Sequence, residues 1–265
     1  MKKNSKKFST PLVSIIMNCH NGERYLAQSI TSVLSQTYKN WELIFFDNKS
    51  NDQSKKILKT FLDKRIKYFK SKKFLNLYQA RNLAISKAKG KYIGFLDTDD
   101  WWMKGKLSKQ VKLIENKNKV NFIYSNLYIY DQKTKNNILY FKNKMPSGKI
   151  TQYLLDDYKL GILTVLMNRK IFNERKFNKK YNIIGDFDFF LNLSLKENFY
   201  CMQEPLAYYR KHEENYSKKI NIFEKELEHW SKKNFTKLEK LNYSLKSFKF
   251  FFYKLKLKKF VGWGL

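Results

Sequence analysis

The chain is 265 residues long, 43% hydrophobic and 17% aromatic, so it has ample apolar sequence for a large core and is not intrinsically disordered. Two widely separated cysteines, Cys19 and Cys201, exclude a disulfide framework, and no apolar run approaches the roughly 18 residues of a transmembrane helix. The net charge of +31 is carried mainly by lysine, as in chains from AT-rich genomes, whereas proteins that read nucleic acid favour arginine.

From residue 11 to residue 119 the sequence predicts strands that alternate with helices. Short apolar runs predict the strands, and apolar residues at helical spacing predict the helices between them. The predicted strands cover 13–17, 41–46, 66–69 and 92–96, and the predicted helices lie near 26–34, 57–62, 77–87 and 107–114, with Gly90 placed to end the third helix. Helical connections of this length imply crossovers, so we expect an α/β fold with a mostly parallel central sheet flanked by helices.

Polar loops follow three of these strands, beginning at Asn18, Asp47 and Asp97. In a parallel sheet such loops meet at one edge, where ligands bind. The stretch Asp97-Thr98-Asp99-Asp100 crowds three carboxylates into four positions, and that much like charge is not buried unpaired. The usual relief is Mg²⁺ or Mn²⁺, which also binds phosphate oxygens. A solvated acidic turn is the alternative reading of this Asp-x-Asp motif.

The second half of the chain predicts further strands at 121–130, 138–142 and 162–167, and a helix that begins near residue 184. Asp186 either caps this helix or, flanked by aromatic residues, has the raised pKa of a general base. His212 is either a surface residue or a further metal ligand, because a metal held by two aspartates lacks protein ligands and imidazole suits Mn²⁺.

The last 45 residues predict an appended helix followed by a basic, aromatic tail. Helical spacing relates Phe223, Leu227, Trp230, Leu238 and Leu241. Residues 241–265 contain six lysines and no acid, together with the aromatic residues Phe248, Phe250, Phe251, Phe252, Tyr253, Phe260 and Trp263. Such a tail either docks on an anionic membrane surface or packs on the catalytic domain.

The most telling stretches occur in a fixed order along the chain. They are VSIIMNCHNGERYL at 13–26, SVLSQTY at 32–38, WELI at 41–44, DNKSND at 47–52, ARN at 80–82, Gly90, and DTDD at 97–100. No single stretch is decisive, but the ordered set resembles the family-2 glycosyltransferases. These are inverting enzymes of GT-A (Rossmann-like) fold that use nucleotide-sugar donors, and the resemblance covers residues 11–217.

The resemblance implies a role for each polar loop. It implies a UDP-sugar donor and a glycan or lipid-linked acceptor, hence a hexosyl- or N-acetylhexosaminyltransferase of bacterial envelope polysaccharide or lipopolysaccharide synthesis. Asp186 matches the catalytic base, and Asp99, Asp100 and His212 match the site of a Mn²⁺ or Mg²⁺ ion. The residues that match the nucleotide-sugar site are Asn18, His20, Asn21, Asp47, Asn48, Arg81, Asp97, Thr98 and Asp99.

The same resemblance divides the chain into a basic tail at 1–10, a GT-A domain at 11–220 and a C-terminal basic, aromatic helical extension at 221–265. Within the domain, 11–119 would form the nucleotide-sugar half and 120–220 the acceptor and catalytic half. We expect a cytoplasmic protein, peripheral on the inner face of the cytoplasmic membrane if the tail binds lipid.

The chain departs from many relatives at two positions. Asp47-Asn48 stands where many have Asp-Asp, and an Asn amide can pair with a nucleobase edge through both its donor and its acceptor. The choice of nucleotide is therefore open. Gly185-Asp186 stands where many have Glu-Asp, which keeps the base and loses its neighbour.

Two other classes of protein compete with this interpretation. A sugar-phosphate nucleotidyltransferase shares the sheet, the acids and the metal, but its usual glycine-rich, cationic loop after the first strand is missing at 18–22. A basic nucleic-acid-binding module explains the charge but not the acids, which repel phosphate without a metal. No Ser-His-Asp, Cys-His, Walker or Gly-x-Gly-x-x-Gly arrangement supports another chemistry. We therefore expect a glycosyltransferase that binds no nucleic acid.

Overall fold

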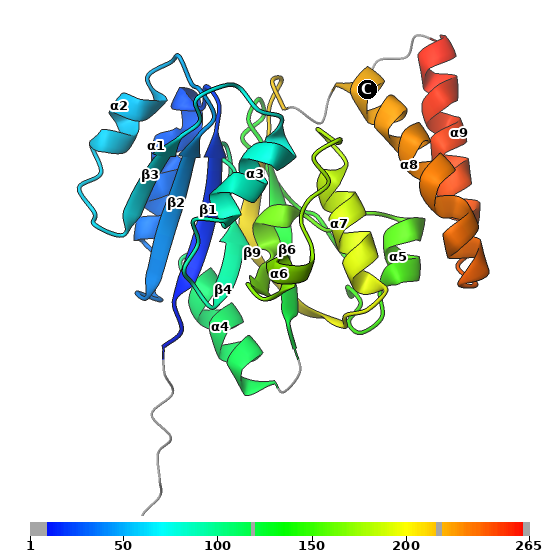
Figure 1. Cartoon of the computed structure of the whole chain (residues 1–265), viewed down its shortest axis with the longest axis horizontal. Coiled ribbons are helices and arrows are strands. Elements are labelled where there is room, and N and C mark those ends of the chain that lie inside the picture. The colour runs from blue at the N-terminus through cyan, green and yellow to red at the C-terminus, as the bar shows by residue number, and fades with distance from the viewer. Residues whose placement is uncertain (1–9, 118–119, 216–218, 262–265) are drawn as a thin grey trace, which may run out of the picture.

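The computed structural model describes residues 10–117, 120–215 and 219–261, in which one nine-stranded sheet carries helices on both faces (Figure 1). The order of the strands is β3-β2-β1-β4-β8-β6-β9-β5, and β7 pairs with β6. Residues 1–9 of the expected basic tail, Ser217 at the end of the family resemblance, and Trp263 lie outside the described residues, as does the side chain of Phe260.

The first half of the chain follows the predicted order of elements. These are β1 (Val13–Cys19), α1 (Glu23–Leu34), β2 (Trp41–Asp47), α2 (Ser54–Lys59), β3 (Ile66–Lys70), α3 (Leu77–Ile85) and β4 (Tyr92–Phe95). Strands β1 to β4 pair in parallel, which confirms the predicted sheet. Alternate residues of β1 enter different cores, because successive side chains of a strand point to opposite faces. Ile15 packs with α1 and α4 on one face, and Ile16 packs with α3 and α7 on the other.

The predicted role of Gly90 is wrong. Helix α3 already ends at Ile85, and Gly90 is needed for a close approach to β1 instead. A Cβ atom at this position would lie 2.5 Å from the backbone nitrogen of Ser14. The Gly90 N–H donates to the Ser14 hydroxyl at 2.8 Å, and that hydroxyl donates to Glu42 at 2.6 Å. This contact fixes the start of β4 beside β1.

The second half turns the sheet from parallel to mixed. Its elements are β5 (Trp101–Trp102), α4 (Lys106–Asn116), β6 (Phe122–Asp131), β7 (Asn137–Leu139), α5 (Thr151–Asp156), η1 (Ile162–Thr164), β8 (Leu166–Asn168), α6 (Ile171–Glu174), α7 (Gly185–Ser194), β9 (Phe199–Lys211), α8 (Ile220–Lys240) and α9 (Lys246–Val261). The predicted strand at 162–167 is wrong in its first half, which is a 3₁₀ turn. The short β8 that follows runs antiparallel between β4 and β6.

The C-terminal helices α8 and α9 form a pair beside α7 and α5 (Figure 1). Trp230 of α8 is fully buried, and Phe248 and Leu255 of α9 are buried as well, so part of the tail packs on the domain. Phe250 and Tyr253 remain exposed at 60% each. Among the described residues, no helix combines the length and the apolarity that crossing a bilayer requires.

Candidate active site

The three polar loops predicted to meet do lie side by side at the carboxyl ends of β1, β2 and β4. In the sheet register Cys19 pairs with Asp47, so β1 and β2 end at one level, and β4 ends at Phe95, opposite Ile16 and two residues before Asp97. The Asn48 N–H donates to the Cys19 carbonyl at 2.7 Å, which ties the first two loops together. This follows from the parallel pairing of strands whose polar loops begin directly after their apolar runs.

The side chains of Asp47 and Asn48 form hydrogen bonds within the protein. Asp47 is 1% exposed and accepts hydrogen bonds from the Ser50 N–H and the Tyr68 hydroxyl, both at 2.7 Å. The Asn48 amide donates to the Leu75 carbonyl at 2.8 Å and accepts from the Leu75 N–H at 3.0 Å. One donor and one acceptor site of the Asn48 amide therefore hold the loop before α3.

The loop after β1 offers open hydrogen-bonding groups. The side-chain nitrogen and oxygen of Asn18 are buried, and neither has a hydrogen-bond partner among the described residues. His20 is exposed. Its Nδ1 lies at hydrogen-bond distance, 3.0 Å, from the Asn48 carbonyl oxygen, and the centroids of the His20 and Phe74 rings are 4.6 Å apart. Asn21 has a left-handed backbone (φ 55°) and accepts from the Asn51 N–H at 2.9 Å. A buried amide without partners is costly, so Asn18 suits a bound ligand.

The acidic motif after β4 divides into three differently bonded carboxylates. Asp97 forms an ion pair with Arg81 of α3, 2.8 Å from Nη2 to Oδ1. Asp99 lies 3.0 Å from Nε2 of His212, just past the end of β9. Asp100 is 2% exposed, and its Oδ1 accepts a hydrogen bond from the backbone N–H of Arg210 at 2.8 Å. Burial and the charges of Asp99 and Asp97 raise the pKa of Asp100 well above its ordinary value. Thr98 stands between Asp97 and Asp99 in the chain, and its carbonyl oxygen accepts a hydrogen bond from the Ser29 hydroxyl at 2.7 Å.

The pair formed by Asp99 and His212 fits a hard divalent cation. A carboxylate and an imidazole suit Mn²⁺, and a cation that binds a diphosphate needs few protein ligands. Nδ1 of His212 is buried without a partner among the described residues. Within those residues no group of three or more His, Cys, Asp or Glu side chains is placed to hold a metal. Asp100 accepts the backbone N–H of Arg210 through Oδ1.

Asp186 lies in the first turn of α7, where its Oδ1 accepts the Phe187 N–H at 2.8 Å and the Tyr78 hydroxyl at 3.1 Å. The bond to Phe187 resembles the predicted capping role, although the cap position itself is Ile184. Burial raises the pKa of Asp186, while the Phe187 N–H, the Arg81 charge and the Tyr78 hydroxyl oppose the rise. The carboxylate thus combines a raised pKa with oriented donors.

Helix α3 joins this carboxylate to the acidic motif. Its Tyr78 contacts Asp186, and Arg81, one turn later, pairs with Asp97. The Arg81 guanidinium lies 5.4 Å from the Tyr78 ring. The importance of Tyr78 was not predicted from the sequence. The only hint of it in the sequence is the glycine at position 185, because a Cβ atom there would lie 2.4 Å from the Tyr78 ring. A glutamate at 185 would therefore displace the tyrosine that contacts Asp186.

Helix α8 holds the segment that leads into α7. The Glu226 carboxylate accepts three successive backbone N–H groups, those of residues 182, 183 and 184, at 2.5, 2.9 and 3.1 Å. One turn later the Trp230 indole N–H donates to Asp188 at 3.0 Å. Asp188 thus bonds to α8, two residues beyond Asp186. The C-terminal extension helps to position the start of α7.

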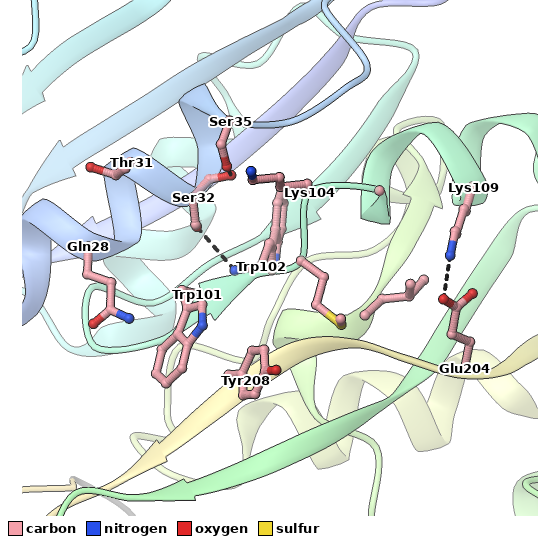
Figure 2. A pocket seen from close by; sticks show the side chains of 13 residues that line it. Gln28, Thr31, Ser32, Ser35, Trp101, Trp102, Lys104, Lys109, Glu204 and Tyr208 are labelled. Carbon is pink, nitrogen blue, oxygen red and sulfur yellow. Dashed lines mark hydrogen bonds and ion pairs between the residues drawn. The ribbon is translucent and has the colours of Figure 1, made fainter. Parts of the chain in front are cut away.

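A hollow of about 540 Å³ lies away from Asp186, between α1 and strands β5 and β9 (Figure 2). Its wall contains Trp101, which stacks on Tyr208 at 4.7 Å and has the Arg210 guanidinium 4.6 Å from its ring. Figure 2 also shows Ser32 bonded to the Trp102 N–H, and Lys109 paired with Glu204. Trp101, which directly follows the acidic motif, is thus held by the Tyr208 ring and the Arg210 guanidinium.

Comparison with known proteins agrees with this geometry. The chain is 37% identical over 188 residues to the UDP-Glc:alpha-D-GlcNAc-diphosphoundecaprenol beta-1,3-glucosyltransferase WfgD of Escherichia coli, which covers 71% of each protein. TarS (residues 1–349) of S. aureus, solved with UDP-GlcNAc, superposes with a TM-score of 0.66 at 18% identity over 78% of this chain and 60% of that one. The mannosyltransferase PcManGT of Pyrobaculum calidifontis, solved with GDP-Man and Mn²⁺, gives 0.62 at 14% identity over 85% and 64%.

These two structural likenesses establish the GT-A type of fold. The family itself follows from the sequence, because the family model described as Glycosyl transferase family 2 matches residues 14–199. The expected family and the expected class of enzyme are confirmed. The chain belongs to glycosyl transferase family 2 and is a glycosyltransferase.

Proposed function

We propose that the protein transfers a sugar from a UDP-sugar to a hydroxyl of a glycan carried on a lipid diphosphate, with inversion at the anomeric carbon. The observation that carries the proposal is that α3 contacts both the acidic motif and the candidate base. Arg81 of α3 pairs with Asp97, and Tyr78 of α3 donates to Asp186. The acidic motif also contains Asp99, which faces His212. The donor is inferred from the UDP-Glc in the name of the E. coli relative, and the lipid diphosphate from the acceptor in the same name.

The residues divide the work of a single displacement. The acceptor hydroxyl attacks the anomeric carbon from the side opposite the diphosphate and loses its proton to Asp186. Asn18, with its open amide, and the neighbouring His20 and Asn21 would bind the nucleoside. Asp47, Asn48 and Thr98 would shape that site through the backbone contacts described above. Arg81 would orient Asp97 and oppose the rise that burial causes in the pKa of this carboxyl.

Asp99 and His212 would hold the divalent cation, Mn²⁺ or Mg²⁺. Such an ion supplies positive charge to a leaving diphosphate. We expect His212→Ala to raise the Mn²⁺ concentration needed for half-maximal activity about tenfold or more, because one ligand is lost. A Mn²⁺ titration of activity measures this. His229→Ala on α8 is the matched control, and a titration that is unchanged in His212→Ala would contradict the assignment.

The pH dependence of transfer tests the role of Asp186. A base acts only when it is deprotonated, and its pKa is raised, so activity should fall on acidification at a pH above the ordinary value for aspartate. The Tyr78 hydroxyl stabilises the charged form. Tyr78→Phe should therefore move this acidic limb to still higher pH, measured as kcat/KM against pH with the Mn²⁺ concentration fixed. A limb that stays in place would exclude this contact from catalysis.

The last helix supports a proposal about where the protein acts. The described part of α9 has exposed Phe250 and Tyr253 together with exposed Lys254 and Lys256, and no acid. Each lysine near an anionic membrane adds about 1 kcal/mol of attraction. We propose that α9 lies against the inner face of the cytoplasmic membrane, where envelope polysaccharide or lipopolysaccharide precursors are extended. The division into residues 1–10, 11–220 and 221–265 remains a prediction.

A thermal-shift screen of nucleotide sugars, with and without Mn²⁺, tests the proposed function. A ligand that binds only the native state raises the melting temperature by mass action. We expect UDP-sugars to stabilise the protein, more strongly with Mn²⁺, and transfer assays to release UDP. Stabilisation by nucleoside triphosphates, with release of pyrophosphate, would favour a nucleotidyltransferase instead.

A further inference from the structure

A cavity of about 310 Å³ lies between α5, α7 and the α8–α9 pair, the group of helices at the right of Figure 1. This volume is at the lower end of the range for ligand pockets. The wall contains Asp186, so the cavity adjoins the carboxylate to which we assign the acceptor proton. It is separate from the loops that surround Asn18 and Asp99, which do not contribute to its wall.

One part of the wall can bind a polar group. Besides Asp186 it contains Tyr158, whose buried hydroxyl lies beside the Asp186 carboxylate and helps to lower the pKa of that group. A carboxylate and a hydroxyl that lie side by side can together bind a ligand hydroxyl. The polar group that enters the cavity therefore meets two side chains that can bind a sugar hydroxyl.

Apart from the exposed Asp156 and Asp157, the remainder of the wall is apolar, and it leads to the surface. Phe223 and Leu227 of α8 lie opposite Phe248 and Phe251 of α9, and the rings of Phe223 and Phe251 are 6.3 Å apart. Phe251 is 46% exposed, so the apolar wall continues onto the outer surface of α9. The cavity thus has a polar part around Asp186 and an apolar part between α8 and α9.

We propose that this cavity binds the first isoprenoid units of a polyprenyl-diphosphate acceptor, while the acceptor hydroxyl meets Asp186. The inference rests on the proposed function and adds the site that recognises the lipid. A hydrocarbon chain suits the aromatic and aliphatic wall, where the hydroxyls of a sugar would lack hydrogen-bond partners. Each methylene buried there contributes about fourfold in affinity, from about 0.8 kcal/mol per CH₂.

The test compares two acceptors that differ only in their apolar part. Ethyl and farnesyl esters of α-D-GlcNAc diphosphate are assayed with UDP-glucose and Mn²⁺, without membranes, in the full chain. We expect kcat/KM for the farnesyl ester to exceed that for the ethyl ester at least about tenfold. Phe251→Glu should abolish this preference, because it places a charge in the apolar wall. Phe250→Glu is the matched control, since Phe250 is exposed on the same helix and does not line the cavity.

Each outcome has a defined meaning. Equal use of both esters by the unaltered protein, or an equal loss of preference in both variants, would overturn the cavity assignment and leave the transferase function intact. If neither ester accepts sugar, the thermal shift with farnesyl diphosphate decides. A shift that is lost in Phe251→Glu supports the site, and no shift in the unaltered protein rejects it. Phe251→Ala replaces the glutamate variant if the latter does not fold. Absence of UDP binding would instead count against the proposed function.

Discussion

Replacing Asp186 with asparagine is expected to lower sugar transfer about 100-fold or more while binding of the UDP-sugar stays near normal. Asparagine keeps the shape of the side chain and can still accept the Phe187 N–H and the Tyr78 hydroxyl. It cannot take a proton from the acceptor. The measurement is steady-state transfer together with UDP-sugar affinity from titration or thermal shift.

Asp188→Asn is the matched control for this variant. Asp188 lies on the same helix, and its Oδ1 accepts the Trp230 indole N–H at 3.0 Å, a bond that an asparagine oxygen can also make. We expect this variant to keep most of its activity. Near-normal turnover of Asp186→Asn at any pH between about 6 and 9 would rule out Asp186 as the base.

Asp99→Ala should reduce activity to less than about one hundredth and weaken UDP binding, because it removes the carboxylate that faces His212. A chelator should have the same effect on the unaltered protein, and added Mn²⁺ should reverse it. Activity at saturating Mn²⁺ and UDP affinity with and without the metal are the quantities to measure. Asp63→Ala, at a surface acid paired with Arg65, is the control.

Full activity of Asp99→Ala, or activity that survives exhaustive chelation, would show that no metal is held at this place. Retained UDP binding with lost transfer would instead show that Asp99 acts after the donor has bound. The two results separate a role in binding from a role in the departure of the diphosphate.

The sheet around the site was predictable because its strands are continuous apolar runs that end abruptly in polar loops. β1, β2 and β4 have this pattern, and parallel pairing then brings Asn18, Asp47 and Asp97 together. Strand β9 was not predicted. Its pairing with β6 shifts register near Asn126 and Pro205, so polar and apolar residues do not alternate regularly along it.

The candidate residues were predictable as a set, but their partners were not. Tyr78 and Glu226 act through contacts with residues more than 40 positions away, with Asp186 and with the backbone at 182–184. Neither contact leaves a local pattern. The internal bonding of the Asn48 amide was hidden in the same way, since its partner Leu75 is 27 residues distant.

The hydrogen bonds from Glu226 of α8 to the segment before α7 limit how the chain can be truncated or joined to parts of its relatives. A chain shortened before Glu226 would leave three backbone N–H groups without acceptors directly upstream of Asp186. Even removal of α9 alone would uncover Phe187, whose ring stacks on Phe248 at 5.9 Å. Loss of activity on truncation would thus report a displaced carboxylate as readily as a lost membrane contact. In chimeras with relatives, the helix that carries the base and the two terminal helices should be exchanged as one unit.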